Sequence, residues 1–505
     1  MAFTTIKPNF DVTMPDVSDS GIDLLNDITA STVWADTTIQ YGFGTASVLA
    51  LDPEFRQIFR SMFGSAKPDA DFAFASLAER AFGMIDSVAG IDFENSTEAA
   101  EVDIVLTSTD DRPRSTLEGF FQFPGKFDHD YAPGESWSIG AFNSALDAMT
   151  ATPELGGGEY ANWTVLHEIG HGLGLKHTHQ EKSGLPALPS VGRFMNNERY
   201  SVMSYNPASD GYKFGHAVSM MALDVAALQG LYGVEDYATG GSTYTLLNAK
   251  GGALSLTEGE VQIGRAYYCI WDSGGEDTID YGSSGKAVMI NLNDATLDTS
   301  GVSAELEALF AQIRETNFFD YMSKSLKADL FDEWHHAGGF FSQVLGIKKG
   351  EFVGSAGGYS IAQGAEIENA RGGNAADLLI GNELDNTILG GDAEDTLVGG
   401  AGADDLDGEA GDDWIDGGAG DDTLGGGEGQ DIFVFSDGYG TDTIIAFEDG
   451  DFIDLRRLTG FEDFDELKGN YMTEQGGDVV ITIGSDILVI KGVTLDDLDA
   501  SDFAI

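Results

Sequence analysis

Residues 372–434 read GGNAADLLI, GNELDNTIL, GGDAEDTLV, GGAGADDLD, GEAGDDWID, GGAGDDTLG and GGEGQDIFV, which are seven nine-residue units in unbroken register. The first position of every unit is glycine, and the eighth is always apolar: Leu379, Ile388, Leu397, Leu406, Ile415, Leu424 and Phe433. Similarity at a short fixed period indicates a coil whose turns stack and bury the recurring apolar side chains. A glycine-rich linker, the alternative, would not keep an apolar residue at one position in every unit. We therefore predict a parallel β-roll over these residues.

The sixth position of the units indicates bound calcium. It holds aspartate in every unit except the second, where Asn386 stands. Carboxylates this dense repel one another within the Debye length of about 8 Å, so the roll should fold poorly without a cation. Extracellular calcium modules bind at roughly 10⁻⁴ to 10⁻³ M, which would leave the roll loose in the cytosol and folded outside the cell. The predicted ligands in the repeats are Asp377, Asp395, Asp404, Asp413, Asp422 and Asp431.

The composition fits this prediction and excludes several classes of partner. The chain has 505 residues, with 26 Lys and Arg against 85 Asp and Glu, and its formal net charge of −59 argues against nucleic acid or anionic membranes as partners. No apolar run reaches about 18 residues, so no membrane insertion is expected. The single cysteine, Cys269, excludes an intramolecular disulfide, so packing and bound ions must provide the stability.

A second motif, HEIGHGLGLKH at residues 167–177, indicates a zinc site. On a helix, His167 and His171 project from one face, with Glu168 beside them. Gly174 allows the chain to leave the helix, so that His177 returns as third ligand. Three neutral imidazoles hold zinc at about 2.0–2.1 Å and leave a position for water, whose pKa falls to about 7. Glu168 would take the proton of that water and pass it to a leaving amine. The motif therefore predicts hydrolysis of peptide bonds.

The alternative for this motif is an amphipathic core helix with Leu166, Ile169 and Leu173 inward. A second segment, YSVMSY at residues 200–205, argues against that alternative. Together the two segments resemble the metzincin zinc proteases, and the form SVMSY is similar to the serralysin branch. The resemblance implies that Met203 lies under the metal. It also implies that Tyr205 is an additional zinc ligand that can swing away and stabilise the tetrahedral intermediate.

The residues around the zinc motif predict a mixed domain. Strands are expected at 37–43 and 100–108, and helices at 71–89 and 221–233. The stretch GFFQFPG, near Phe120 to Phe123, is either an edge strand that holds an extended substrate by main-chain hydrogen bonds or a core strand.

The resemblance to serralysins, which combine a metzincin domain with repeats of the RTX type, extends over roughly residues 37–505. The segment WDSGGEDTIDY at 271–281 is similar to the serralysin segment that leads into the roll; it offers Asp272 and Asp277 as calcium ligands, with an acidic turn as the alternative. The family implies export by a type I system that reads a C-terminal signal of an acidic residue followed by apolar ones, here Asp502 to Ile505. The first residues, MAFTTIKPNF, lack the pattern of a signal peptide, in agreement with this route.

Two regions depart from the family pattern. Residues 301–352 look helical and interrupt the strand-rich region; His335 and His336 there are expected on a surface helix, and His179 at the surface or behind the zinc ligands. Residues 1–36 are acidic and are expected to be a pro-segment. A carboxylate of this pro-segment would cover the zinc before cleavage, and the candidates are Asp11, Asp16 and Asp19.

The sequence thus predicts an α+β metzincin-like catalytic domain at 37–235, followed by an all-β parallel β-roll domain at 236–505 with a helical insert at about 301–352. The expected function is a secreted, calcium-stabilised zinc endopeptidase that acts on protein or peptide substrates as a monomer and is made as a latent zymogen. A calcium-dependent adhesin or surface-layer protein with an inactive protease-like domain is the alternative. Loss of a zinc ligand or of Glu168 would favour that alternative, and neither is lost.

Overall fold

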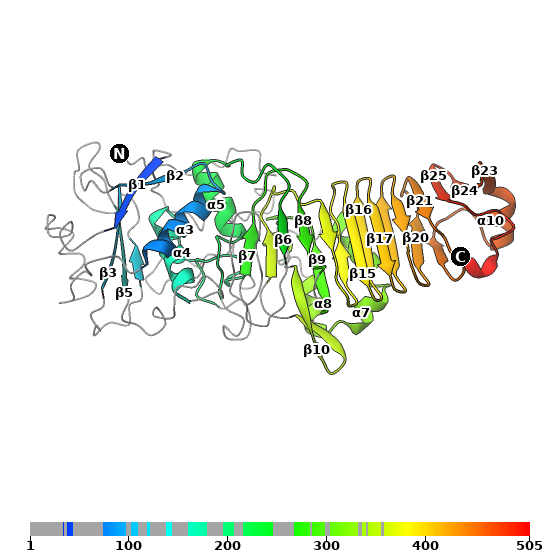
Figure 1. The fold of residues 1–505 in the computed structure, drawn as a ribbon, viewed down its shortest axis with the longest axis horizontal. Coiled ribbons are helices and arrows are strands. Elements are labelled where there is room, and N and C mark those ends of the chain that lie inside the picture. The colour runs from blue at the N-terminus through cyan, green and yellow to red at the C-terminus, as the bar shows by residue number, and fades with distance from the viewer. Residues whose placement is uncertain are drawn as a thin grey trace.

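The computed structural model of the chain is elongated, with the N-terminal region at one end and a long stack of strands at the other (Figure 1). It describes residues 34, 38–43, 74–96, 103–109, 119–121, 138–143, 160–178, 195–206, 216–245, 267–282, 285–297, 304–331, 336–339, 342–354 and 358–505. Within these ranges, none of the helices is both long and apolar enough to span a bilayer.

The N-terminal region contains a five-stranded sheet of order β2-β1-β3-β5-β4. Its strands are β1 (Thr38–Phe43), β2 (Asp92–Asn95), β3 (Ile104–Thr109), β4 (Gly119–Phe121) and β5 (Ser138–Asn143). The predicted strands at 37–43 and 100–108 are confirmed as β1 and β3. All neighbours pair in parallel except β4, which runs antiparallel to β5 at the edge of the sheet. Of the two possibilities left open for the stretch near Phe120, the edge strand is therefore the one observed.

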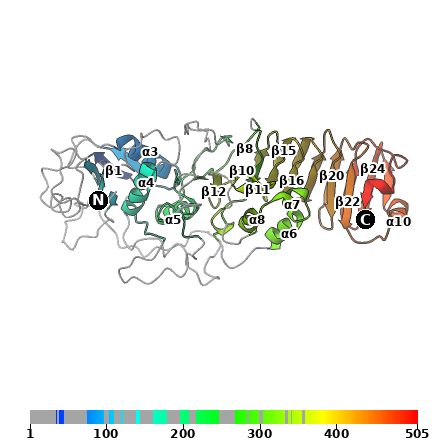
Figure 2. The same cartoon turned by 90° about the horizontal axis from the view of Figure 1, so that it is seen from below.

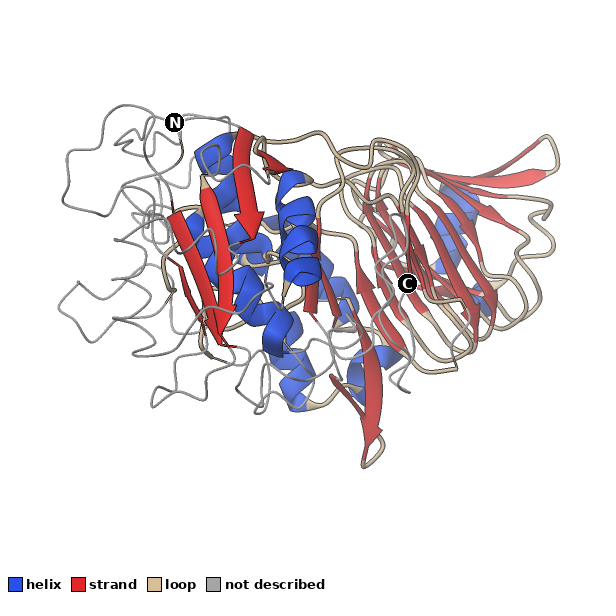
Figure 3. Ribbon diagram, turned by 60° about the vertical axis from the view of Figure 1, so that its left-hand side comes forward, coloured by secondary structure: helices blue, strands red, loops and turns tan. Residues whose placement is uncertain are grey.

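Three helices accompany this sheet in the N-terminal region (Figure 1 and Figure 3). They are α3 (Ala75–Asp86), α4 (Tyr160–Gly172) and α5 (Ala222–Tyr232), of which α3 and α4 contact strands of the sheet. Helix α3 confirms the helix predicted at 71–89 and buries the stripe Leu77, Ala78, Ala81, Phe82 and Ile85. Helix α5 confirms the one predicted at 221–233, and it ends at Gly233, whose φ of 94° a residue with a side chain rarely adopts. Helix α4, which carries the zinc motif, is buried along almost its whole length and contacts α3, β4 and β5.

The repeats form two parallel sheets that share one core. Successive units alternate between the sheets, so strands eighteen residues apart are neighbours: Leu379 pairs with Leu397 and then Ile415, while Ile388 pairs with Leu406 and then Leu424. The strands are β13 (Asn369–Arg371), β14 (Leu378–Ile380), β15 (Thr387–Asp392), β16 (Thr396–Ala401), β17 (Asp405–Ala410), β18 (Trp414–Ala419), β19 (Thr423–Gly425) and β20 (Ile432–Ser436). The eighth-position side chains of all seven units lie buried in a single cluster, so the two sheets face each other. The prediction of a strand-rich region after the zinc motif is confirmed.

The two sheets continue beyond the repeats at both ends. Before the repeats, β8 (Thr278–Asp280) pairs with β13, β9 (Val288–Asn291) pairs with β14, and β6 (Thr243–Thr245) pairs with β8. After them come β21 (Thr441–Ile445) and β22 (Phe452–Arg457), in turns lengthened to twenty residues between Thr423 and Thr443. A cap closes the end: α10 (Phe464–Asn470), β23 (Met472–Gln475), β24 (Asp478–Ile483), β25 (Asp486–Ile490), a 3₁₀ turn η4 (Ala500–Asp502) and β26 (Phe503–Ala504).

The insert leaves the coil after β9 and returns at β13. Its first part is helical as predicted, in α6 (Ala304–Ile313), α7 (Asn317–Tyr321) and α8 (Lys324–Leu330). The prediction of helix up to residue 352 is wrong, because β10 (Gln343–Lys348) and β11 (Glu351–Gly354) form an antiparallel hairpin. Lys349 and Gly350, with φ of 58° and 84°, make the tight turn, and β10 adds to the sheet beside β9. A short parallel pair of β12 (Gly358–Ile361) and β7 (Tyr267–Ile270) completes the region.

The insert covers the outer face of one of the two sheets (Figure 2). A second buried apolar cluster contains residues of the helices and of the sheet together: Ala287, Met289, Ile313, Phe318, Met322, Leu326, Leu330, Leu345, Leu378, Ile380, Val398, Trp414 and Val434. Polar contacts join the same surfaces, since the Gln312 amide donates to the Tyr439 hydroxyl at 2.6 Å and Arg457 bridges Glu315 and the buried Asp416, each at 3.2 Å. The insert is therefore part of the folded coil.

We expect truncation of this interface to destabilise the coil strongly. Phe318 is 3% exposed and its ring stacks on Phe352 at 4.8 Å, so Phe318→Ala should lower the free energy of unfolding by about 3–5 kcal/mol. Tyr321, in the same helix but 54% exposed, provides the control Tyr321→Ala, for which a loss below about 1 kcal/mol is expected. Urea unfolding in saturating calcium measures both. Equal losses would show that the helices do not stabilise the coil.

Candidate metal centre

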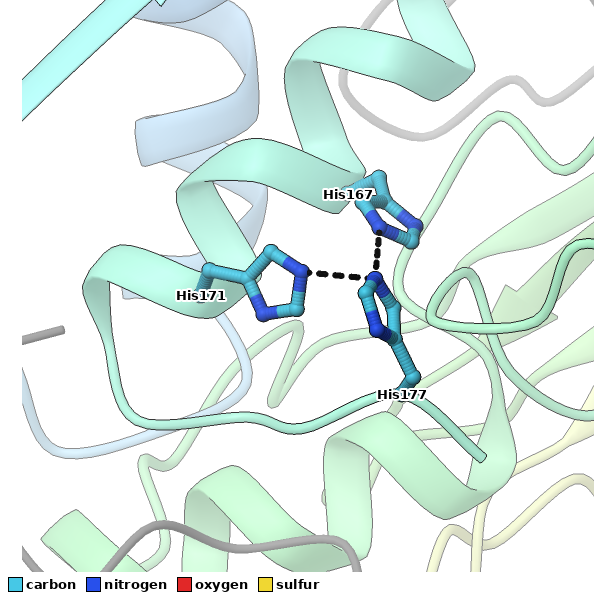
Figure 4. Close-up of side chains that lie close together, drawn as sticks. All are labelled: His167, His171 and His177. Carbon is cyan, nitrogen blue, oxygen red and sulfur yellow. Dashed lines mark hydrogen bonds between the residues drawn. The ribbon is translucent and has the colours of Figure 1, made fainter. Parts of the chain in front are cut away.

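Helix α4 and the turn after it bring three imidazoles together. His167 and His171 project from one face of α4, and Gly174, with φ of 101°, turns the chain so that His177 faces them. The Nε2 atom of His177 lies 3.1 Å from that of His167 and 3.0 Å from that of His171, as Figure 4 shows. A tetrahedral ion at about 2.0–2.1 Å would hold its ligand nitrogens about 3.3 Å apart, so the spacing fits zinc.

The other ring nitrogens determine which atoms face the centre. His167 Nδ1 lies 2.7 Å from the carbonyl oxygen of Val202, and His171 Nδ1 lies 2.7 Å from that of Leu175. A carbonyl only accepts, so each Nδ1 must carry the proton and each Nε2 presents its lone pair to the centre. His177 Nε2 lies within 3.1 Å of both of these lone pairs, so a cation among the three nitrogens would contact all of them. The donor set of these residues therefore fits a divalent metal.

Glu168 and Met203 both lie at helix α4 and are buried. Glu168 is next to His167 in the helix and is 8% exposed. Met203 is fully buried, and a Cβ added to Gly170 would lie 2.7 Å from its Sδ atom. The methionine therefore packs directly against the backbone of α4 between the two histidines. A side chain at Gly170 would therefore force Met203 to shift.

The sequence analysis missed the residue that holds the turn around Met203, at residues 200–205. Asp224 of α5 is fully buried and accepts hydrogen bonds from Ser201 Oγ at 2.6 Å, Val202 N at 2.7 Å and Met221 N at 3.0 Å. Burial raises the pKa of Asp224 to about 6, although these donors lower it again in part. The carboxylate connects α5 to the turn whose Val202 carbonyl orients His167. One acidic residue within the apolar run MALDVAAL was the available signal.

Tyr205 lies beside the three histidines. Its hydroxyl is 2.8 Å from His177 Nε2, and its ring stacks on that of His167 with centroids 5.1 Å apart and an interplanar angle of 18°. The side chain is 50% exposed, so it has room to move. The structure thus groups Tyr205 with His167, His171 and His177.

The sixth-position aspartates form two ladders along the coil. In each ladder a backbone N–H donates to Oδ1 of the aspartate eighteen residues ahead, as Asp395 N does to Asp413 at 2.7 Å and Asp404 N to Asp422 at 2.9 Å. The second carboxylate oxygen, Oδ2, is buried and has no hydrogen-bond partner in the described part of the chain in Asp395, Asp404, Asp413, Asp422 and Asp431. Buried acceptors of this kind are costly unless a cation or a proton meets them.

Backbone oxygens converge on the same places. A Cβ added to Gly390 would lie 2.7 Å from Asp395 Oδ2 and 2.7 Å from the carbonyl oxygen of Gly408. Only glycine leaves this space open between turns, and carboxylate and carbonyl oxygens are the ligands that calcium takes. Burial, followed by neighbouring carboxylates, raises the pKa of Asp395 to about 9, and burial raises those of Asp404 and Asp413 to about 8. The ladders therefore fit calcium.

Two of the sixth positions differ from the others, and one further aspartate joins a ladder. Asp377 accepts from Val288 N and Gly373 N, both at 2.7 Å, so protein donors meet both of its oxygens. Asn386 accepts from Asn382 N at 2.8 Å and donates to the Glu368 carbonyl at 2.9 Å. Asp442, which the sequence analysis missed, continues a ladder by accepting from Asp422 N at 3.2 Å, and its Oδ2 has no partner among the described residues. The signal was the spacing Asp-x-Ile at 442–444, which repeats that of the units.

Asp272 and Asp277 lie at the start of the coil and are both fully buried. Tyr244 donates its hydroxyl to Asp272 Oδ2 at 2.7 Å, whereas Asp277 accepts from Ser242 N at 2.6 Å and leaves its Oδ2 without a partner. Burial, and then the charge of Asp272, raises the pKa of Asp277 to about 6. Asp277 thus resembles the ladder positions more closely than Asp272 does.

Of the other histidines and the pro-segment carboxylates that the sequence analysis named, only His336 is among the described residues. His336 is 3% exposed, and its Nε2 lies 2.9 Å from the Leu330 carbonyl oxygen, so the expectation of a surface position is wrong for it. Its ring packs against that of Phe310 in helix α6 of the insert. His179, His335, Asp11, Asp16 and Asp19 lie outside the described residues.

Comparison with known proteins agrees with this geometry. Residues 34–193 match the matrixin peptidase family, and residues 371–406 and 398–433 match the RTX calcium-binding nonapeptide repeat. The chain is 33% identical over 280 residues to metalloprotease AprA of Pseudomonas entomophila, covering 53% of this chain and 44% of that protein. It is 28% identical over 328 residues to serralysin of Proteus mirabilis (63% of this chain, 52% of that protein) and 28% identical over 348 residues to serralysin of Photorhabdus laumondii (65% and 59%).

The aligned part spans about half the length of these relatives. The predicted resemblance to serralysin-type metzincins with RTX repeats is confirmed, and so are zinc and calcium as the metals of these two regions. The matches support the predicted enzyme class, a zinc metalloendopeptidase.

Proposed function

We propose that this chain is a secreted, calcium-stabilised zinc endopeptidase that hydrolyses peptide bonds in proteins. The observation that carries the proposal is the convergence of three Nε2 atoms, from His167, His171 and His177, beside Glu168 and Tyr205. Bound zinc would supply a water whose pKa is near 7 and a Lewis acid for the scissile carbonyl.

The residues of the chain would perform the proton transfers. Glu168 would accept a proton from the attacking water and donate it to the leaving amine, and its burial would keep competing water away. The Tyr205 hydroxyl would swing from His177 and donate to the oxyanion of the tetrahedral intermediate. Because β4 is at the edge of the sheet among the described strands and contacts α4, its outer backbone groups would hold an extended substrate beside the histidines.

The C-terminal coil would be a parallel β-roll that calcium folds. The supporting observations are the buried Oδ2 atoms without partners and the raised pKa values of the ladder aspartates. We place the peptidase domain at 37–235 and the roll domain at 236–505. Export through a type I system, with folding outside the cell, is part of the proposal and is supported by the RTX match.

Removal of zinc tests the proposal. A chelator that prefers transition metals, used with calcium in excess, should reduce casein hydrolysis to background, and added zinc should restore it. Metal analysis should find one equivalent of zinc per chain. Full hydrolysis by zinc-free protein would refute the proposed chemistry.

Latency would be tested in the same assay. We propose that residues 1–36 are a pro-segment and that Asp11, Asp16 or Asp19 covers the zinc until cleavage. Hydrolysis should then rise after limited proteolysis of the full chain. An equal rate before and after cleavage would argue against a zymogen without affecting the zinc chemistry.

A further inference from the structure

An aromatic side chain beside the zinc ligands has no part in the mechanism above. Trp163 lies one helical turn before His167 on α4, so its ring is on the same face as His167 and His171. Its ring centroid is 5.0 Å from that of His167 and 6.2 Å from that of Tyr205, the latter pair meeting edge to face at 67°. One indole thus contacts both a candidate ligand and the candidate oxyanion donor.

A buried hydrogen-bonded pair contacts the same indole. The centroid of His216 lies 5.7 Å from that of Trp163, and His216 Nδ1 lies 2.8 Å from Glu198 Oε2. His216 and Glu198 are 7% and 0% exposed. Because separating a buried carboxylate from its partner is strongly unfavourable, the pair fixes the imidazole in one position. Tyr160, with centroids 5.3 Å from Trp163 and 5.1 Å from His216, packs against both.

Tyr205 needs such support because half of its surface is exposed. An exposed side chain changes rotamer within nanoseconds, whereas catalysis by its hydroxyl requires a defined position close to His177. An edge-to-face contact is strong enough to shift a rotamer population between about twofold and tenfold. Trp163 is 4% exposed and therefore provides a rigid surface for this contact.

We propose that Trp163, held by the Glu198–His216 pair, is a positioning residue that keeps Tyr205 beside the zinc ligands. The inference rests on the proposed function, because it acts through the role given there to Tyr205. A tryptophan that only fills the core would also be buried at this position, so the test must separate loss of stability from loss of coupling to Tyr205.

The test is a double-mutant cycle in the full chain with calcium and zinc present. Trp163→Leu should lower kcat about five- to tenfold with little change in KM, and Trp163→Phe, which keeps a ring, should recover most of the loss. In the Tyr205→Phe background, Trp163→Leu should change kcat less than about twofold. Zinc affinity, measured by competition with a chelator, should show the same pattern, since Tyr205 is a candidate ligand. Glu198→Gln should act in the same direction as Trp163→Leu but more weakly.

Trp34 provides the matched control. It is 3% exposed, and its Nε1 donates to the Gly172 carbonyl at 2.9 Å, at the other end of α4. Trp34→Leu should lower stability and affect kcat equally in both backgrounds.

The outcomes separate the two claims. If Tyr205→Phe lowers kcat but the Trp163 effect is the same in both backgrounds, the positioning inference is overturned and the proposed function stands. If Tyr205→Phe leaves kcat and zinc affinity unchanged, the role of Tyr205 fails, and this inference fails with it. If Trp163→Leu does not fold, Trp163→Phe in the same two backgrounds decides, with a coupling of about twofold or more expected and additivity overturning the inference.

Discussion

Glu168→Gln will lower kcat by about 10²- to 10⁴-fold while the protein keeps its zinc and its fold. The loss is large because glutamine has nearly the shape of glutamate but accepts no proton at neutral pH, so only the general-base contribution is removed. The residue is 8% exposed, which leaves little room for bulk water to replace it as a base. Initial rates of casein or peptide hydrolysis, together with zinc analysis of the same sample, measure the effect.

The interpretation depends on two controls. Zinc content must equal that of the unsubstituted protein, since a loss of metal would explain inactivity without a base. The His171→Ala variant should lose zinc and activity together, because it removes one of the three converging Nε2 atoms. Undiminished hydrolysis by zinc-loaded Glu168→Gln would exclude Glu168 as the base.

Removal of calcium will unfold the C-terminal coil at pH 8. Each site contributes about 2.7 kcal/mol when free calcium is 100 times its Kd, so losing several sites removes as much free energy as the roughly 5–15 kcal/mol that stabilises a typical domain. Without the cation, the buried Oδ2 atoms of the ladders have no hydrogen-bond partner among the described residues, and each carboxyl group that ionises at pH 8 becomes an uncompensated buried charge. Circular dichroism during titration with a calcium chelator, followed by calcium addition, measures the loss and recovery of strand signal.

The calcium-free coil will be more stable in acid. Folding raises the pKa of Asp422 and Asp431 to about 6, of Asp404 and Asp413 to about 8, and of Asp395 to about 9. A raised pKa means that the protonated form stabilises the fold fully below the unfolded value of about 3.9, and that this stabilisation is lost as the pH rises through 6 to 9. In chelator, strand signal should therefore fall between about pH 5 and pH 9. In excess calcium it should not, because the cation replaces the proton.

Two adjacent aspartates provide a matched pair for the ladder itself. Asp404 is 2% exposed and belongs to a ladder, whereas Asp405 is exposed. Asp404→Asn should raise the calcium concentration at half-folding about tenfold, since Asn386 shows that the shape of asparagine fits while its charge is missing. Asp405→Asn should leave that concentration unchanged. An equal effect of both would mean that net charge, and not the buried ladder, controls folding.

The sequence was sufficient for the nine-residue repeat and for the convergence of the three histidines. The nine-residue period predicted which side chains enter the core, because a stacked coil repeats one environment at every turn. The spacing of His167, His171 and Gly174 likewise predicted the convergence of the imidazoles, since it follows from local backbone geometry. Both are short-range constraints that a sequence pattern expresses directly.

The features that escaped the sequence analysis depend on contacts between distant residues. Asp442 belongs to a turn of twenty residues, so a strict period of nine does not reach it. Strand β10 was predicted as helix because its short apolar run has no clear periodicity. Its pairing with β9 determines that it is a strand. Burial of His336 requires Phe310 and Leu330, which only the packed insert brings together.

One further signal lay in alternate units of the repeat. Leu378, Ile380, Val398, Trp414 and Val434, at the seventh and ninth positions of the odd units, are apolar and lie beneath the insert. The same positions of the fourth unit hold Asp405 and Asp407, which point away from the core. An outer period of eighteen thus accompanies the inner period of nine, and it distinguishes the covered sheet from the other one.

The sheet that the insert covers limits the use of this coil as an isolated module in protein engineering. A fragment beginning at residue 358 would keep every glycine and every aspartate of the seven repeat units. It would also expose Val398, Trp414 and Val434 to water as an apolar stripe. Such a fragment would self-associate whatever the calcium level. A soluble calcium-responsive building block from this chain must either carry residues 304–354 along or replace the stripe with polar side chains.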